Sequence, residues 1–549
     1  MSPEAAEGAL DIDPPPDRAG RRLARSAGLA GIATLTSRVL GLARESIQAA
    51  IFGAGNEVDA FLIAFRIPNL ARDLFAEGAM SAAFVPTFTR YLTLRGKAEA
   101  WRLGNSVINT LLLVCGLLSL LGIIFAGPLV TLYAGDYAAV PGKLQLTVQL
   151  TRVMLPLMTL VAIAAAMMGM LNSLHHYFIP ALSPAMFNVA SISCMVALVP
   201  VMPFLEWPRI MALPVGVILG GLGQIVIQWA SLRGEGFRYR PFLNFRDEGL
   251  QRMLGLMGPG TLGLAATQMN VFINTLLATR QGTGAVSWLT YAFRLMYLPI
   301  GLFGVSIATA VLPQASRHAA TGEHEATGNV VSRGLALMMA LNVPAMFGLM
   351  VLAEPIVRLL FERGRFLPSD TASTAAALRF YAVGLVGYSA ARIVSPVFYA
   401  IGRSRVPVAV SLGSIACNIA GGFLLSRFLG FRGLALSTSI AALVNGGMLF
   451  WLLRSPLRGL DEGHLFLTLV KTLVAAGVMA VTAFGVERWT STFTGLMGGD
   501  HLVAQGLRLS AAIGAGLVAL AASAKVLRVR EFDEALAMAR ERMETLRLS

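Results

Sequence analysis

The chain has 549 residues, of which 56% are hydrophobic and only 13% are charged, and its mean hydropathy is +0.68. A soluble domain carries roughly twice that charged fraction, so the composition excludes an ordinary soluble protein and indicates a helical membrane protein. The net charge of +14 does not by itself indicate a nucleic-acid partner, because loop lysines and arginines set the orientation of membrane proteins.

Residues 1–26 are polar and proline-rich and carry several arginines, so we expect a disordered cytoplasmic leader there. Apolar runs of about 20 residues then recur along almost the whole chain and predict about 14 transmembrane helices. The predicted spans are 27–52, 58–89, 104–134, 148–171, 182–203, 210–232, 252–279, 285–314, 332–353, 373–400, 406–427, 433–454, 465–486 and 505–526.

The first two predicted spans carry an unusual number of charged residues. They are Arg38, Arg44, Glu45, Asp59, Arg66, Arg72, Asp73 and Glu77. Each costs at least about 2.5–3.5 kcal/mol near the middle of a membrane and persists where it faces water or a partner. The arginines therefore predict a cationic cavity with an anionic ligand. As an alternative, Arg38 and Arg44 only extend toward the interface or pair with the nearby acids.

The residues from Ser37 to Pro86 carry a dense family resemblance. The strings SRVLGLARE, FGAG, DAF and RIPNLARDLFAEGAMSAAFVP closely resemble the first two helices of the MurJ/MviN lipid II flippases. That family belongs to the multidrug/oligosaccharidyl-lipid/polysaccharide exporter superfamily. Glu45 stands where the family usually has aspartate, and Arg66 where lysine is common, so both departures keep the sign of the charge.

An internal repeat divides the chain. AAFVPTFTR at 82–90 recurs as TAVLPQASR at 309–317, and FNVAS at 187–191 recurs as CNIAG at 417–421. The two nearly equal offsets predict two parallel six-helix repeats around a central cavity, as in several transporters. The expected parts are a leader (1–26), an N-terminal lobe (27–232), a cytoplasmic linker (233–251), a C-terminal lobe (252–455), two further transmembrane helices (456–527) and a cytoplasmic amphipathic tail (528–549). The two further helices could hold a lipid tail or simply pack.

Charged and polar residues of both halves form the candidate site. In the second half, Ser287 and Arg294 match a serine and an arginine seven residues apart in the family's eighth helix. Arg294 could instead form a structural pair with an acid of the first half. The predicted substrate-binding residues are Arg38, Arg44, Arg66, Asn69, Arg72, Ser287 and Arg294, and the predicted gate or orienting residues are Glu45, Asp59 and Glu77.

The resemblance implies a flippase that moves lipid II to the periplasmic leaflet by alternating access. Arginine forks suit a diphosphate because they chelate two oxygens and keep their charge. The alternatives are an exporter of another polyprenyl-linked saccharide, a drug or cation antiporter of the same superfamily, and a membrane enzyme. A cation antiporter needs an acidic cavity, and an enzyme needs catalytic carboxylates or a nucleophile with its base, so neither is favoured.

No cofactor or metal is expected, and the membrane potential is a candidate driving force. Spans 252–279 and 406–454 hold no carboxylate and carry asparagines such as Asn270, Asn274 and Asn418 instead, which argues against the sodium site reported for some relatives. The loops on the side of the N-terminus are the basic ones. They place both termini of a multi-pass protein in the cytoplasm, and the family resemblance implies a bacterial inner membrane. The expected partners are lipid II and membrane lipids, with contacts to cell-wall synthesis proteins left open, and the expected state is a monomer.

Overall fold

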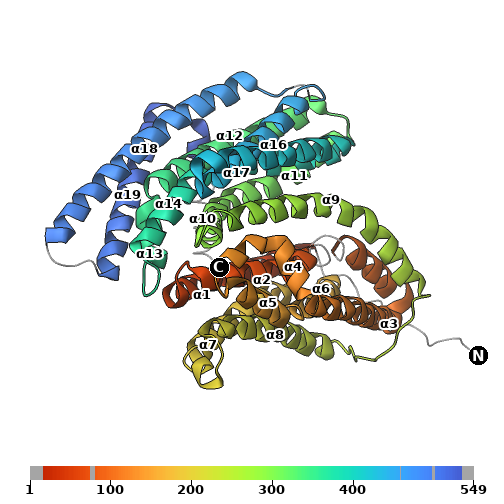
Figure 1. The fold of residues 1–549 in the computed structure, drawn as a ribbon. Helices are drawn as coiled ribbons and strands as arrows, with labels where there is room; N and C mark the ends of the chain where they lie inside the picture. Colours follow the sequence, from red (N-terminus) through yellow and green to blue (C-terminus); the bar gives the residue numbers. More distant parts are fainter. Residues whose placement is uncertain (1–15, 74–80, 458, 497–500, 535–549) are drawn as a thin grey trace, which may run out of the picture. The chain divides into compact units, whose positions relative to one another are not determined.

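The computed structural model describes residues 16–73, 81–457, 459–496 and 501–534, and within these ranges all regular elements are helices (Figure 1). The described residues form two compact units. Unit 1 comprises residues 16–44, 68–124 and 153–261, and unit 2 comprises 45–67, 125–152 and 262 onward. Unit 2 thus includes two segments of the predicted N-terminal lobe. The lobes, which rest on the sequence repeat, remain a prediction.

Unit 1 is a helical bundle around a mostly aliphatic and aromatic core. Its helices are α3 (Ser81–Ile124), α6 (Leu157–Ser173), α7 (Phe178–Leu198) and α8 (Ala212–Gly234), with the 3-10 turns η3 (Met202–Leu205) and η4 (Arg209–Met211) and parts of α1 (Pro16–Phe52), α2 (Asn56–Arg72) and α9 (Glu248–Thr279). Successive ring pairs at 5.3–5.8 Å run from Phe84 through Phe88 and Trp101 to Phe237. These contacts fix the start of the linker against α3.

Unit 2 holds the remaining helices. They are α4 (Ala126–Ala134), η2 (Gly135–Ala139), α5 (Lys143–Met154), α10 (Ala285–Pro299), the π-helical turn η5 (Ile300–Gly304), α11 (Val305–Ala320), α12 (His324–Val351), α13 (Ala353–Phe361), α14 (Pro368–Ala382), α15 (Leu385–Ala400), α16 (Arg405–Leu429), α17 (Phe431–Leu453), α18 (Glu462–Leu496) and α19 (Leu502–Val526). In this unit, residues from the end of α1 contact the loop after α13, where the Arg365 amide donates to the Ala50 carbonyl over 2.9 Å.

The repeat seen in the sequence reappears in the packing within each unit. In unit 1, α6 packs on α3 and α8, and α7 packs on α8; in unit 2, α15 packs on α12 and α17, and α16 packs on α17. The repeated prolines Pro86 and Pro313 both lie inside helices, α3 and α11. The short helices α4 and α13, each of nine residues, occupy corresponding places in the two halves.

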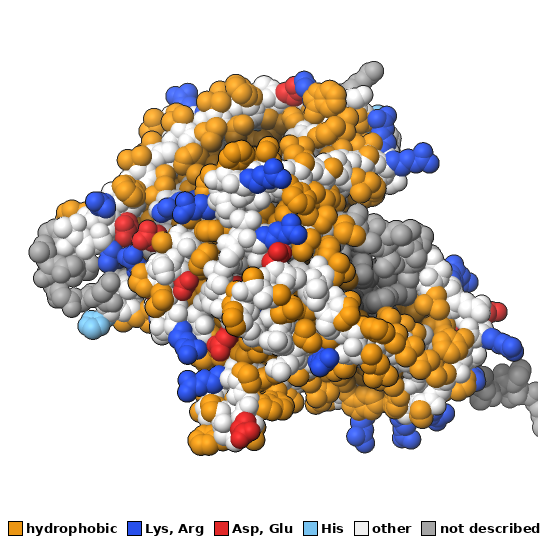
Figure 2. Space-filling view, viewed as in Figure 1, with side chains coloured by type: hydrophobic (Ala, Val, Ile, Leu, Met, Phe, Trp, Pro, Cys, Tyr) orange, Lys and Arg blue, Asp and Glu red, His pale blue; other side chains and the backbone are white. Residues whose placement is uncertain are grey.

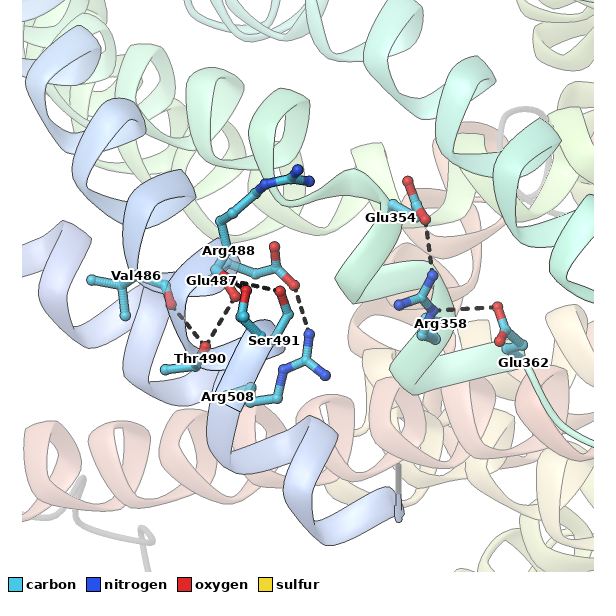
Figure 3. A network of polar contacts seen from close by, with 10 residues as sticks. Glu354, Arg358, Glu362, Val486, Glu487, Arg488, Thr490, Ser491 and Arg508 are labelled. Carbon is cyan, nitrogen blue, oxygen red and sulfur yellow. Dashed lines mark hydrogen bonds and ion pairs between the residues drawn. The ribbon is translucent and has the colours of Figure 1, made fainter. Parts of the chain in front are cut away.

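The last two membrane helices pack against the rest of unit 2. α18 contacts α12 and α19, and α19 also contacts α13. Arg508 of α19 and Glu487 of α18 form an ion pair of 3.0 Å (Figure 3). On α13, Arg358 pairs with Glu354 and Glu362 (Figure 3). Packing therefore accounts for the position of both helices, and a role in holding a lipid tail stays a prediction.

Ten described helical segments are long and apolar enough to cross a membrane, or eleven if the bent pair α14–α15 is one span. The count of fourteen is not confirmed. The remaining predicted spans 27–52, 58–89 and 252–279 lie mainly on α1, α2 and α9. α2 has only 17 residues, and α1 carries several charged residues in its apolar stretch. Figure 2 shows that hydrophobic side chains cover much of the visible surface, as expected of a protein in lipid.

Three local expectations differ from the structure. α1 begins at Pro16, so the second part of the leader expected to be disordered is helical, in keeping with its alanine, leucine and arginine content. The expected loop 90–102 is helical on both sides of Gly96, whose positive φ of 81° marks the break. α3 ends at Ile124 and α4 begins at Ala126, which divides the predicted span 104–134. Residues 1–15 and 535–549 of the leader and tail lie outside the described residues.

Candidate functional site

Asp59, near the start of α2, is the most deeply enclosed acid of the candidate site. Its side chain has no exposed surface, and the Lys143 ammonium lies 2.9 Å from one carboxylate oxygen. The same carboxylate accepts hydrogen bonds from the amides of Gly284 (2.8 Å) and Ser287 (3.1 Å) and from the Ser287 hydroxyl (2.7 Å). Asp59 therefore caps the first turn of α10, where a negative charge is favoured by the helix dipole.

Lys143 begins α5 and completes this buried cluster. Its side chain is 2% exposed, and its ammonium also lies 3.9 Å from the centre of the Tyr137 ring. A lysine in such a place is stabilised only by its partners, since a buried charge without a counter-ion is strongly disfavoured. Sequence reasoning missed Lys143 because it lies between two predicted spans. The signal that could have found it is that lysine is rare in this chain and that Lys143 lies just before an apolar segment.

Glu45 and Arg294 form a second ion pair, with 2.7 Å between Arg294 Nε and Glu45 Oε1. Glu45 lies on α1 with 11% of its side chain exposed, whereas Arg294 lies on α10 with 55% exposed. The pairing left open for Arg294 by the sequence is therefore present. One carboxylate uses one edge of the guanidinium, and the exposed remainder is available to an anion.

The remaining predicted residues have different surroundings. In unit 1, the Arg44 guanidinium lies 5.5 Å from the centre of the Phe187 ring, and Arg38 is exposed. Asn69 is buried, and its carboxamide oxygen has no hydrogen-bond partner among the described residues. Arg66, in unit 2, is half-buried.

The structure brings together only part of the predicted set. Asp59 with Ser287, and Glu45 with Arg294, are in direct contact. Ser287 is fully buried and its hydroxyl donates a hydrogen bond to Asp59, and substrate binding by Ser287 stays a prediction. Glu77 and the side chain of Arg72 lie outside the described residues. Joint action of Arg44, Arg72 and Arg294 stays a prediction.

Two of the three asparagines considered for a cation, Asn270 and Asn418, belong to a hydrogen-bonded chain in unit 2. The Asn418 amide donates to the Asn270 oxygen over 2.7 Å, and the Ser437 hydroxyl donates to the Asn418 oxygen over 3.1 Å. The described residues contain no group of three or more His, Cys, Asp or Glu side chains that could hold a metal. Asn188, the repeat counterpart of Asn418, donates to the Ser37 carbonyl in unit 1 over 3.0 Å. Both asparagines thus tie helices together.

Comparisons with known proteins identify the family. The profile of the family described as "Lipid II flippase MurJ" matches residues 48–497, which is most of the chain. The chain belongs to the MurJ lipid II flippase family. A MurJ relative from Burkholderia cenocepacia, named "Lipid II flippase MurJ", is 35% identical over 468 residues, covering 83% of this chain and 89% of the relative. A "Probable lipid II flippase MurJ" from Vibrio cholerae is 32% identical over 504 residues, covering 87% of this chain and 94% of the relative.

The fold agrees with this membership. A solved MurJ structure in an inward closed conformation matches with a TM-score of 0.73 and 25% identity, covering 91% of this chain and 99% of that chain. An inward-facing multidrug transporter of the MATE family matches with a TM-score of 0.64 at 16% identity, covering 77% of this chain and 97% of that chain. The second match shows a shared fold alone. Within this fold, the MurJ family membership distinguishes the chain from the drug transporters.

Proposed function

We propose that this protein is a flippase that carries lipid II, the lipid-linked precursor of peptidoglycan, from the cytoplasmic to the periplasmic leaflet. The observation that carries the proposal is Arg294, an arginine of a membrane helix that pairs with Glu45 and still has 55% of its side chain exposed. A guanidinium in that state has donors left for a diphosphate. Family membership names the cargo, and through it a role in cell-wall synthesis and cell shape.

The arginines have one role in this proposal and the acids another. Arg44, Arg72 and Arg294 act together on the diphosphate, because several fixed forks are needed to offset its charge. Arg38, Arg66 and Asn69 contribute to headgroup contacts. Asp59, Glu45 and Glu77 serve as gate or orienting partners, since a carboxylate next to a diphosphate repels it. Ser287 acts through Asp59.

Alternating access supplies the route, and the membrane potential supplies a driving force. Rocking of the two repeats around a central site exposes the headgroup first to one side and then to the other. A potential that is negative inside favours outward movement of an anion by about 2.3 kcal/mol per charge for each 100 mV. No covalent step is required of the protein, in keeping with a transport family rather than an enzyme family.

The orientation we propose has both termini in the cytoplasm of the inner membrane, with the chain acting as a monomer. Its support is a set of exposed basic residues, Arg233 in the last turn of α8 and Arg238, Arg240 and Arg246 in the loop between α8 and α9. Single cysteines at 235–245 should resist an impermeant thiol reagent in intact cells, whereas cysteines at 55–57 or 282–283 should react. Labelling of 235–245 from outside would contradict this orientation.

Headgroup selectivity tests the function against its main alternative, an exporter of another polyprenyl-linked saccharide. Purified protein should bind lipid II more tightly than a polyprenyl diphosphate that carries a different saccharide without the peptide. Equal binding of the two would favour the alternative exporter, and preferential binding of a drug cation would favour an antiporter.

A further inference from the structure

A cavity of about 300 Å³ lies in unit 1, where α3 meets the start of α9, apart from the residues assigned to cargo. It is lined by Pro86, Thr87, Arg90, Tyr91, Leu94, Arg95, Glu248, Gly249 and Arg252. Three arginines against one glutamate leave the cavity positively charged. A cavity with these charges calls for an anionic occupant.

The three arginines are not equivalent. Arg95 forms an ion pair of 3.2 Å with Glu248, and its guanidinium lies 4.6 Å from the centre of the Tyr91 ring. Arg90 and Arg252 are exposed and have no ion pair with any other described residue. Two guanidinium forks therefore remain for a ligand, and each fork matches the oxygens of a phosphate group.

In the wall of the cavity, the Tyr91 ring packs tightly against the start of α9. A side chain added at Gly249 would come within 2.8 Å of the Tyr91 hydroxyl, so glycine allows the Tyr91 ring to lie against the start of α9. The first-turn amides of Gly249 and Leu250 already donate to Asp247, over 2.8 Å and 3.1 Å. The helix N-terminus is thus occupied, and the arginines are the groups left to receive an anion.

The segment that leads into the cavity, residues 237–246, is held along a membrane helix. Asn105 of α3 donates to the Arg238 carbonyl over 3.0 Å, and Asn109 donates to the carbonyls of Arg240 (2.8 Å) and Phe242 (3.0 Å). This fixed backbone leaves large apolar side chains exposed beside the exposed arginines. They are Tyr239, Phe242, Leu243 and Phe245, and Leu94 at the cavity itself is 69% exposed. Aromatic and aliphatic side chains mixed with arginine are typical of a membrane interface.

We propose that this cavity binds the phosphate of an acidic phospholipid from the surrounding leaflet, with its acyl chains against Leu94 and the exposed apolar residues of 237–246. Arg90 and Arg252 hold the phosphate, and Arg95 is positioned by Glu248 and Tyr91 at its side. A soluble anion uses the arginines but not the apolar surface. The presence of both kinds of surface therefore favours a lipid, as in basic pockets between membrane helices.

The test is lipid retention by the full-length protein, purified in a neutral detergent and measured by native mass spectrometry. We expect phosphatidylglycerol to be retained and phosphatidylcholine to be exchanged away. Arg90→Gln and Arg252→Gln should each weaken phosphatidylglycerol binding by about tenfold, the value of one charge-assisted hydrogen bond. Arg90→Lys and Arg252→Lys should weaken it less. Arg233→Gln is the matched control, an exposed arginine nearby that does not line the cavity, and it should retain the lipid.

Competitors decide between sources of the anion. Inorganic phosphate at millimolar concentration should not displace phosphatidylglycerol; displacement would show a soluble-anion site and overturn the proposal. Equal retention of phosphatidylcholine and phosphatidylglycerol, or equal loss in Arg233→Gln and Arg90→Gln, would overturn it as well. If lipid II displaced phosphatidylglycerol and Arg90→Gln also lost lipid II, the cavity would belong to the cargo path. Thermal unfolding of each variant confirms that it is folded.

Discussion

Two ion pairs of unit 2 differ sharply in how much of their side chains is exposed. The Asp59–Lys143 pair has 0% and 2% of its side chains exposed, whereas in the Glu45–Arg294 pair the arginine is 55% exposed. Asp59 also accepts three hydrogen bonds from Gly284 and Ser287. The first pair is closed to any ligand, and the second still presents a cation. Burial, rather than the mere presence of charge, separates a structural pair from a binding group.

The energetic consequences of this difference are opposite. Removing one partner of a buried pair leaves an uncompensated charge, which costs about 3–5 kcal/mol. Removing Glu45 from the second pair changes stability little, because water solvates the exposed Arg294 guanidinium that remains. Removing Arg294 leaves a mostly buried Glu45 carboxylate, so its cost lies between these two cases. The enclosed pair should therefore be seen mainly in stability, and the open pair mainly in transport.

The largest effect is expected at Lys143. Lys143→Ala should lower the free energy of unfolding by about 3–5 kcal/mol, because Asp59 is left charged and buried. Thermal unfolding of the purified protein in detergent measures this loss. Unchanged unfolding would contradict the enclosure of the pair.

A double variant sharpens the same experiment. Asp59→Asn combined with Lys143→Met removes both charges and keeps one oxygen, which can accept from Ser287, while the Gly284 amide loses its acceptor. It should recover part of the stability lost in Lys143→Ala. If its transport stays low while its stability is restored, the pair has a role in gating beyond packing.

Arg294→Ala should show the reverse behaviour. We expect a smaller loss of stability than in Lys143→Ala, because Arg294 is more than half exposed although the Glu45 left behind is only 11% exposed, together with loss of growth support when this is the cell's flippase. Arg294→Lys should keep part of the activity, since lysine keeps the charge but not the bidentate fork. Growth complementation at equal protein level, with thermal unfolding beside it, checks both parts. Full complementation by Arg294→Ala would contradict a role in cargo binding.

These two pairs also show which features of the site can be predicted from the sequence and which cannot. The charges Glu45, Asp59 and Arg294 were identifiable because their types are costly within apolar helices. Their partners were not. Lys143 lies outside the predicted spans, and the serine–arginine spacing of α10 gave no indication that Ser287 turns toward Asp59 rather than toward a ligand. Which way a side chain faces depends on contacts between segments far apart in sequence.

The fold was predicted in the same uneven way. Helical class and the internal repeat follow from hydropathy and from paired motifs around Pro86 and Pro313. The break at Gly96 within α3 and the bend between α14 and α15 did not follow, because a hydropathy window averages over such breaks. The sequence also did not predict that residues 45–67 and 125–152 belong to unit 2, because this depends on contacts between segments far apart in the chain.

A smaller effect is expected at Glu45, the partner in the open pair. Glu45→Gln removes a carboxylate that competes with an anion for Arg294, so lipid II affinity should rise, by about fivefold if the pair contributes about 1 kcal/mol. Transport should slow, because release of cargo is no longer assisted by the returning carboxylate. Equilibrium binding of fluorescent lipid II measures the affinity. A large loss of binding would instead place Glu45 in direct contact with the cargo.

The smallest effect is expected at Glu235, an ion pair outside the membrane spans. A hydrogen bond from His176, followed by one from Lys97, lowers the pKa of Glu235 below its ordinary value. Its contribution to stability is therefore complete above the unfolded pKa of about 4.3 and is lost as the pH falls through the lower folded value. Glu235→Gln should change unfolding by less than about 1 kcal/mol at neutral pH, and the difference should vanish in acid. A large effect would mean that side-chain exposure does not determine how much these ion pairs contribute to the free energy of unfolding.

Translocation of fluorescent lipid II in reconstituted vesicles tests the central claim most directly. The unchanged protein should make headgroups on the far leaflet accessible to a membrane-impermeant quencher. Arg294→Ala should not do so, although thermal unfolding shows that it remains folded. Translocation by Arg294→Ala at the rate of the unchanged protein would contradict the claim that the open guanidinium of α10 carries the anionic cargo.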